Sequence, residues 1–159
     1  MKQLNLYSST YFKSQASFGG ELNHNKRKSR RPLDPKKPLH VVLRCAGHKL
    51  VFLHQDPIIN KIIRKWAARF TIKIYESSVN ANHLHSVIGF KHRKLYHAYI
   101  SALSGEISKL FKIKWQYRPF TRIVEWGRDF KNARAYVIKN QREAWGLISY
   151  QPRYKSAPS

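Results

Sequence analysis

The stretch TIKIYESSVNANHLHSVIGF, residues 71–90, decides the fold that the rest of the chain can adopt. Apolar and polar residues alternate over Thr71–Ser77, which predicts a strand, and the apolar positions of His83–Phe90 predict a second strand. Between them, residues 80–82 read NAN, and asparagine side chains favour tight turns because they hydrogen-bond to the local backbone. We therefore expect an antiparallel hairpin near the centre of the chain.

A strand and a helix are expected before this hairpin. Leu39–Arg44 (LHVVLR) is a short β-branched run typical of a strand, and Lys49–Leu53 is expected to extend it or pair with it. Asp56 and the proline after it resemble an N-cap followed by proline at the first helical position. The apolar residues that follow recur at helical spacing, which predicts an amphipathic helix over residues 57–70.

A second helix and strand are expected after the hairpin. Helical spacing predicts a helix over residues 94–112, and Phe120–Trp126 predicts a fourth strand. Asp129 is then expected to cap a last helix that runs to about Trp145 and stops at Gly146. The order β-α-β-β-α-β is the ferredoxin-like arrangement. We predict an α+β fold, an antiparallel sheet with helices on one face, followed by a C-terminal helix.

The two ends of the chain differ in composition from this region. Residues 1–37 show neither a helical nor an alternating period and include the run KRKSRR at 26–31, so we expect a basic N-terminal arm. Such a run is either a solvated arm or a segment that follows a phosphate backbone, because like charges repel unless they are neutralised. The expected domain covers residues 38–148, and a polar tail covers 149–159.

The charge balance indicates the class of partner. The 159 residues include 31 Lys and Arg against 8 Asp and Glu, a net charge of +23, yet 42% are hydrophobic and 13% aromatic. This hydrophobic content excludes a disordered basic tail. A polyanion would relieve the self-repulsion, so we expect a folded domain that binds nucleic acid. Cys45 is the only cysteine, which excludes an intrachain disulfide and a zinc ribbon. With no apolar segment of signal or membrane-spanning type, a cytoplasmic location is expected.

Four residues are candidates for chemistry. His83 and His85 are two apart on a predicted strand, so both imidazoles can face one ion or phosphate; hydrogen-bonded structural histidines are the alternative. Two histidines are too few ligands for a divalent ion, so a third ligand must come from elsewhere in the chain. Tyr136 and Asn140 are four apart on the last predicted helix and share a face. Tyrosine is a good nucleophile once a metal or base activates it, and asparagine can supply a neutral oxygen ligand. Ordinary packing and solvation are the alternatives for both.

These segments carry a family resemblance. Asn82–His85 resembles the HUH motif (His, hydrophobic residue, His), and AYVIKN at 135–140 is similar to the tyrosine helix of single-tyrosine HUH transposases. The basic segment Lys26–Val42 looks like the start of REP-associated tyrosine transposases. The resemblance covers about residues 20–147 and implies the HUH nuclease fold. It also implies a metal-dependent transposase that cleaves and rejoins single-stranded DNA next to hairpin (palindromic repeat) sequences through a 5′-phosphotyrosine intermediate.

The resemblance further implies roles for individual residues. Tyr136 would be the nucleophile, and His83, His85 and Asn140 would bind Mg²⁺ or Mn²⁺. Gln141 follows Asn140 and is the reserve ligand or a residue supporting it. Some relatives are dimers in which the tyrosine helix serves the partner's histidines and others are monomers, so a homodimer stays open.

A larger set of residues is expected to contact DNA. Aromatic side chains can stack on unpaired bases while Lys and Arg follow the backbone; helix-to-strand packing and plain solvation are the alternatives. The candidates are Lys26, Arg27, Lys28, Arg30, Arg31, Lys91, Arg93, Lys94, Trp115, Tyr117, Arg118, Arg134 and Lys139. The competing hypothesis is a non-catalytic, ferredoxin-like RNA- or DNA-binding module. Such a module has no reason to gather His83, His85, Tyr136 and Asn140 at one place. A third hypothesis is a domesticated relative that binds hairpins without cutting them.

Overall fold

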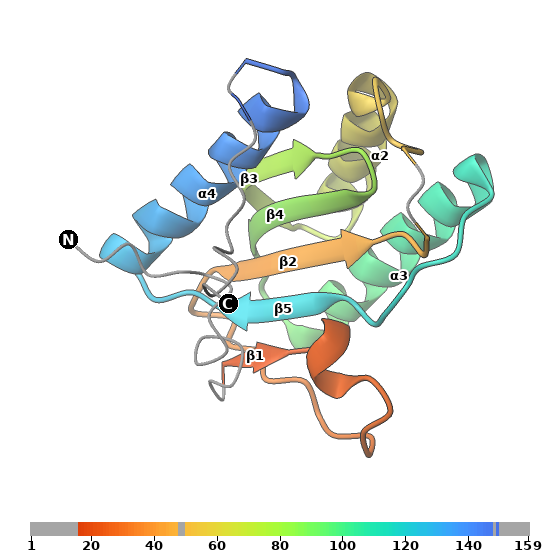
Figure 1. Ribbon diagram of the computed structural model, residues 1–159. Helices are drawn as coiled ribbons and strands as arrows, with labels where there is room; N and C mark the ends of the chain where they lie inside the picture. The colour runs from red at the N-terminus through yellow and green to blue at the C-terminus, as the bar shows by residue number, and fades with distance from the viewer. Residues whose placement is uncertain (1–15, 48–49, 148, 150–159) are drawn as a thin grey trace, which may run out of the picture.

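The predicted order of strands and helices is present, with one added strand at the N-terminal end (Figure 1). The computed structural model describes residues 16–47, 50–147 and 149. Its strands are β1 (Ser17–Phe18), β2 (Leu39–Arg44), β3 (Lys73–Val79), β4 (His83–Gly89) and β5 (Phe120–Ile123). They form one antiparallel sheet in the order β1-β5-β2-β4-β3, so β2 and β4 are neighbours inside the sheet. This confirms the predicted α+β class.

Helices cover both faces of this sheet. After the short 3₁₀ helix η1 (Gly20–Asn23) come α2 (Asp56–Arg69), α3 (Arg93–Phe111) and α4 (Arg128–Ala144). The main core lies between the sheet and the adjacent helices α2 and α3, and it includes Leu84 and Ile88 of β4. A second cluster joins Val87 of β4 to Ala133 and Val137 of α4. Because side chains alternate along a strand, α4 must cover the face opposite to α2 and α3. No helix in the described ranges is both long and apolar enough to cross a membrane.

Three predicted elements have different bounds in the structure. Residues 50–53 do not extend or pair with β2; residues 51–54 form turns, and the N–H of Phe52 donates to Ala81 O at 2.9 Å. β3 begins and ends two residues later than predicted. β5 ends at Ile123 rather than residue 126, because Gly127, at φ 93°, turns the chain into α4.

Asp56 is not the N-cap of α2, contrary to the sequence prediction. Gln55 is the N-cap residue, and Asp56 is the first residue of the helix. Its Oδ2 accepts hydrogen bonds from Nε2 of Gln141 at 3.0 Å and from Nε1 of Trp145 at 2.6 Å. The carboxylate therefore attaches the C-terminal end of α4 to the start of α2, where the positive end of the helix dipole also favours it.

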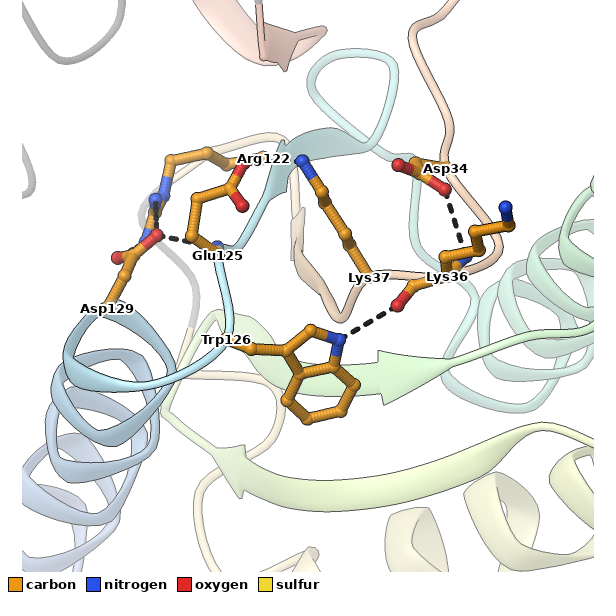
Figure 2. A network of polar contacts seen from close by, with 7 residues as sticks. All are labelled: Asp34, Lys36, Lys37, Arg122, Glu125, Trp126 and Asp129. Carbon is orange, nitrogen blue, oxygen red and sulfur yellow. Dashed lines mark hydrogen bonds and ion pairs between the residues drawn. The ribbon is translucent and has the colours of Figure 1, made fainter.

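Asp129 likewise does not cap α4, because Gly127 is the N-cap residue. Asp129 lies in the first turn, and its two oxygens accept from Nη1 and Nη2 of Arg122, each at 2.9 Å (Figure 2). The N–H of Glu125 donates to the same carboxylate at 2.9 Å. This network ties the N-terminal end of α4 to β5, so α4 is held at both ends.

The added strand β1 pairs with β5 and is anchored by Arg31. Nη1 of Arg31 donates to Pro119 O and to Thr121 Oγ1, each at 2.7 Å, and its guanidinium lies over the Phe18 ring. Gly19, at φ +84°, allows the close approach, since a Cβ there would overlap the carbonyl oxygen of Pro119. Part of the predicted arm is therefore built into the edge of the sheet.

Candidate active site

β4 carries both histidines of the HLH motif on the face that α4 covers. The His83 side chain is half-buried and His85 is buried, and their ring centroids are 4.7 Å apart at an interplanar angle of 78°. Nδ1 of His83 lies 2.7 Å from Oδ1 of Asn82. A carboxamide oxygen only accepts, so Nδ1 of His83 carries the proton and Nε2 keeps the lone pair that a metal ligand needs.

α4 brings Tyr136 to these histidines. The Tyr136 ring is half-buried, and its centroid lies 5.5 Å from the His85 ring in an edge-to-face arrangement of 81°. Val137, the next residue, is fully buried against Val87 and thereby sets the rotation of the helix. The tyrosine and the histidines that it approaches belong to one chain, although they are far apart in the sequence.

Two amide side chains follow Tyr136 on α4, and they have different surroundings. Asn140 is 1% exposed and lies one turn after Tyr136, with its Nδ2 donating to Tyr136 O at 2.9 Å. Gln141 uses both ends of its amide: Oε1 accepts from the Val79 N–H at 2.8 Å, and Nε2 donates to Asp56. Gln141 thus fastens α4 to β3 and α2, which favours Asn140 over Gln141 as a ligand.

The side chains of β4 and α4 offer donor types that suit a divalent cation. Across the ranges that the structure describes, no group of three or more His, Cys, Asp or Glu side chains is arranged to hold a metal ion. A metal beside His83 and His85 would therefore take an amide oxygen, and Asn140 is a buried source of one. Imidazole suits transition metals, whereas carbonyl oxygen and water suit Mg²⁺ and Mn²⁺, so a mixed set of these donors fits Mn²⁺ well.

A third histidine, His40 on the neighbouring strand β2, lies beside His85. Its Nε2 is 3.3 Å from Nδ1 of His85, and the two rings are stacked at 19°. The Tyr136 ring also contacts it, with centroids 5.9 Å apart. Burial lowers the pKa of His40 to about 4, with the charge of Asp129 opposing the shift, so the ring is neutral at pH 7.

Sequence reasoning did not single out His40 as a site residue. The available signal was the alternation in LHVVLR, which places His40 on the strand face opposite to Leu39, Val41 and Leu43. The position of His40 next to His85 follows only from the antiparallel register of β2 and β4. In this register His40 pairs with Val87, and Val42 pairs with His85.

The basic segments that the sequence analysis treated separately come together in the fold. Arg30 of the arm lies near the start of α3. The pKa of Arg93 there is lowered by burial first and then by the charge of Arg30. The arm also meets the segment before β5, where the rings of His24 and Tyr117 lie 5.2 Å apart. All the candidates except Arg31 have exposed or half-buried side chains; apart from Trp115 and Arg134, they are Lys26, Arg27, Lys28, Arg30, Lys91, Arg93, Lys94, Tyr117, Arg118 and Lys139.

Three other candidates have side chains engaged within the fold. Arg31 is buried and holds β1 against β5. The indole N–H of Trp115 donates to Ser104 O at 3.0 Å. Arg134 forms an ion pair with Glu76, Nη2 to Oε2 at 3.4 Å. These contacts give the three side chains structural roles, and the remaining exposed or half-buried residues are the better candidates for DNA contacts.

The sheet order, the helices on both faces and the tyrosine beside paired histidines define a single-tyrosine transposase fold. The sequence profile described as "Transposase IS200 like" matches residues 36–136, and the chain belongs to this family. A solved REP-associated tyrosine transposase, described as bound to a REP hairpin, is similar with a TM-score of 0.60 at 14% identity, over 77% of this chain and 76% of that chain. A solved protein from Deinococcus radiodurans R1 gives a TM-score of 0.47 at 14% identity, over 72% and 97%. Comparison with curated protein sequences gave no match.

The family match confirms the predicted family, and the likeness to the REP-associated protein confirms the predicted fold. The family match ends at Tyr136, so it includes the HLH strand and reaches the tyrosine of α4. At 14% identity, the likeness to the hairpin-bound protein establishes the fold of this chain. The roles of individual residues rest on the geometry above.

Proposed function

We propose that the protein cleaves and rejoins single-stranded DNA next to hairpin sequences, with Tyr136 as the nucleophile. The observation that carries this proposal is the approach of the Tyr136 ring to His85, whose ring stands beside that of His83. A module that only bound nucleic acid would gain nothing from a half-buried tyrosine over two histidines. Membership of the IS200-like transposase family supports the same reading.

His83, His85 and Asn140 are the residues that would hold Mg²⁺ or Mn²⁺. A divalent ion bound there would supply Lewis-acid polarisation of a scissile phosphate. All three side chains are neutral ligands, so they leave the charge of such an ion available to the phosphate. Gln141 supports this set indirectly, because its bonds to β3 and α2 fasten the helix that carries Asn140.

The chain's own residues then perform a transesterification. The Tyr136 oxygen loses its proton and attacks phosphorus, and a P–O bond forms as the bond to the 3′ oxygen breaks. The 3′ oxygen takes up a proton, which leaves a 5′-phosphotyrosine and a free 3′-OH. Because the link conserves the energy of the phosphodiester, a second 3′-OH can reverse the step and join a new strand without ATP. The attachment of α4 through Asp129 and Gln141 keeps the tyrosine oriented, which lowers the entropy cost of the attack.

The exposed basic residues are proposed to bind the DNA. The related REP-associated transposase is described as bound to a REP hairpin, and we extend that ligand class to this chain. The arm, the start of α3 and the segment before β5 converge, so they offer phosphate contacts on one surface. Binding should weaken steeply with salt, because each neutralised phosphate releases counterions.

The test is covalent capture on a denaturing gel. Wild-type protein, Tyr136→Phe and the matched control Tyr75→Phe are each incubated with a library of single-stranded hairpin DNAs and Mn²⁺. We expect an adduct with the wild type and with Tyr75→Phe, and none with Tyr136→Phe. Absence of an adduct across the library, together with salt-sensitive DNA binding, would favour the non-catalytic binding module instead.

A further inference from the structure

His40 occupies a position that connects the proposed ligand His85 to the proposed nucleophile. It is 3% exposed, and its ring contacts three other rings: stacked on His85, and edge-to-face with Tyr136 and with Phe120. Among the described residues, Nε2 of His40 lies 3.3 Å from Nδ1 of His85, which is within hydrogen-bond distance. The ring is therefore placed where it can influence both the orientation of His85 and the choice of its protonated nitrogen.

Asn82 faces Nδ1 of His83 in the same way that His40 faces Nδ1 of His85. Its Oδ1 accepts from Nδ1 of His83, which leaves Nε2 of that ring as the metal-binding nitrogen. If His85 binds the same ion through its own Nε2, its Nδ1 must carry a proton and donate it. The atom facing Nδ1 of His85 is Nε2 of His40, and this nitrogen accepts the bond when the proton of the His40 ring is on Nδ1.

Stability alone does not explain a histidine at this position. Nδ1 of His40 is buried and has no hydrogen-bond partner among the described residues. Burying an unsatisfied ring nitrogen is unfavourable, and an apolar side chain of similar volume would avoid that cost. A buried polar group of this kind next to candidate catalytic residues indicates a functional constraint.

We propose that His40 is a positioning residue: it accepts the Nδ1–H of His85 and so directs Nε2 of His85 toward the ion that His83 also binds. His40 acts on the metal only through His85 and is not itself a ligand. This inference rests on the proposed function, since it assigns His40 a task within that metal site.

The test compares three substitutions of His40 in the full-length protein. The amide of glutamine reaches about as far as Nε2 of histidine, so His40→Gln keeps an acceptor facing His85. Asparagine reaches only as far as Nδ1, and leucine has no acceptor, so His40→Asn and His40→Leu remove the contact. Mn²⁺ affinity is measured without DNA by electron paramagnetic resonance, and circular dichroism checks that each variant is folded.

We expect Mn²⁺ to bind roughly 10- to 100-fold more weakly to His40→Leu and His40→Asn, as for other partners of metal-binding histidines, and to His40→Gln within about threefold of wild type. A second measurement, long-range ¹H–¹⁵N NMR of the Mg²⁺-loaded wild type, should show the proton of His85 on Nδ1. Folded His40→Leu with wild-type Mn²⁺ affinity, or a His85 proton on Nε2, would overturn the role of His40 and leave the proposed metal site intact. Failure of the wild type to bind Mn²⁺ would instead overturn the metal site, and His40's role with it.

Discussion

Replacing Asp129 by asparagine should loosen the N-terminal end of α4 and destabilise the domain. Both carboxylate oxygens of Asp129 accept from the Arg122 guanidinium at 2.9 Å, and one of them also accepts the N–H of Glu125 (Figure 2). The Arg122 side chain is only 7% exposed, whereas that of Asp129 is 32% exposed. Asparagine removes the negative charge beside this buried guanidinium while nearly keeping the size of the side chain.

The magnitude follows from the burial of the pair. Breaking one side of a fully buried ion pair costs about 3–5 kcal/mol, and an exposed pair contributes about 0.2–1 kcal/mol. One member here is buried and the other is a third exposed, and asparagine keeps one acceptor oxygen. We therefore expect a loss of about 2 kcal/mol in the free energy of unfolding, a large part of the roughly 5–15 kcal/mol of a typical domain.

The assay is urea unfolding followed by circular dichroism, with a control from the same loop. Glu125→Gln removes the ion pair between Glu125 and Lys37. The Glu125 side chain is 64% exposed and that of Lys37 is 35% exposed. That control should lose much less stability than Asp129→Asn, because exposed ion pairs contribute little. Hydrogen exchange should show faster exchange of the α4 amides in Asp129→Asn than in the control, because the helix loses its attachment to β5.

Equal unfolding free energies for the two variants would refute this reasoning. So would an Asp129→Asn protein whose α4 amides keep wild-type protection, because the carboxylate would then not hold the helix that carries Tyr136.

The remaining predictions concern other contacts of the fold. Gln141→Leu should cost about 2 kcal/mol in urea unfolding, since it leaves a buried β3 N–H without its acceptor. Gly19→Ala should cost about 1–3 kcal/mol through its positive φ and overlap with Pro119, whereas Gly105→Ala, in open space inside α3, should stabilise by about 0.5–1 kcal/mol. Burial raises the pKa of the Cys45 thiol to about 11, so its thiolate fraction at pH 8 is about 100-fold below that of an ordinary cysteine. Iodoacetamide should label the native protein at least that much more slowly than the urea-unfolded protein, and comparable rates would contradict the burial.

Elements with a strong local period were predictable from sequence. The alternation of LHVVLR matched β2 at both ends, and the predicted helix at 57–70 lies within one residue of α2. The strand β1 was not predicted, because two residues have no period and their pairing depends on Arg31 contacts. Asp56 was predicted as a cap from its local pattern, but its carboxylate is bound by donors from the far end of the chain.

The same division holds for the candidate site. The spacing of His83 and His85, and that of Tyr136 and Asn140, follows from the sequence, because periods of two and of four residues determine which side chains share a face. The sequence did not determine that these two faces meet. That depended on α4 packing over Val87 on the sheet face that α2 and α3 leave uncovered.

The place of His40 beside His85 came from tertiary structure in the same way. It depends on the antiparallel register of β2 and β4, which joins segments that are distant in the chain. Local periodicity encodes the direction of a side chain relative to its own element. Only the burial of apolar surface between distant elements decides which directions converge, and this convergence creates the site.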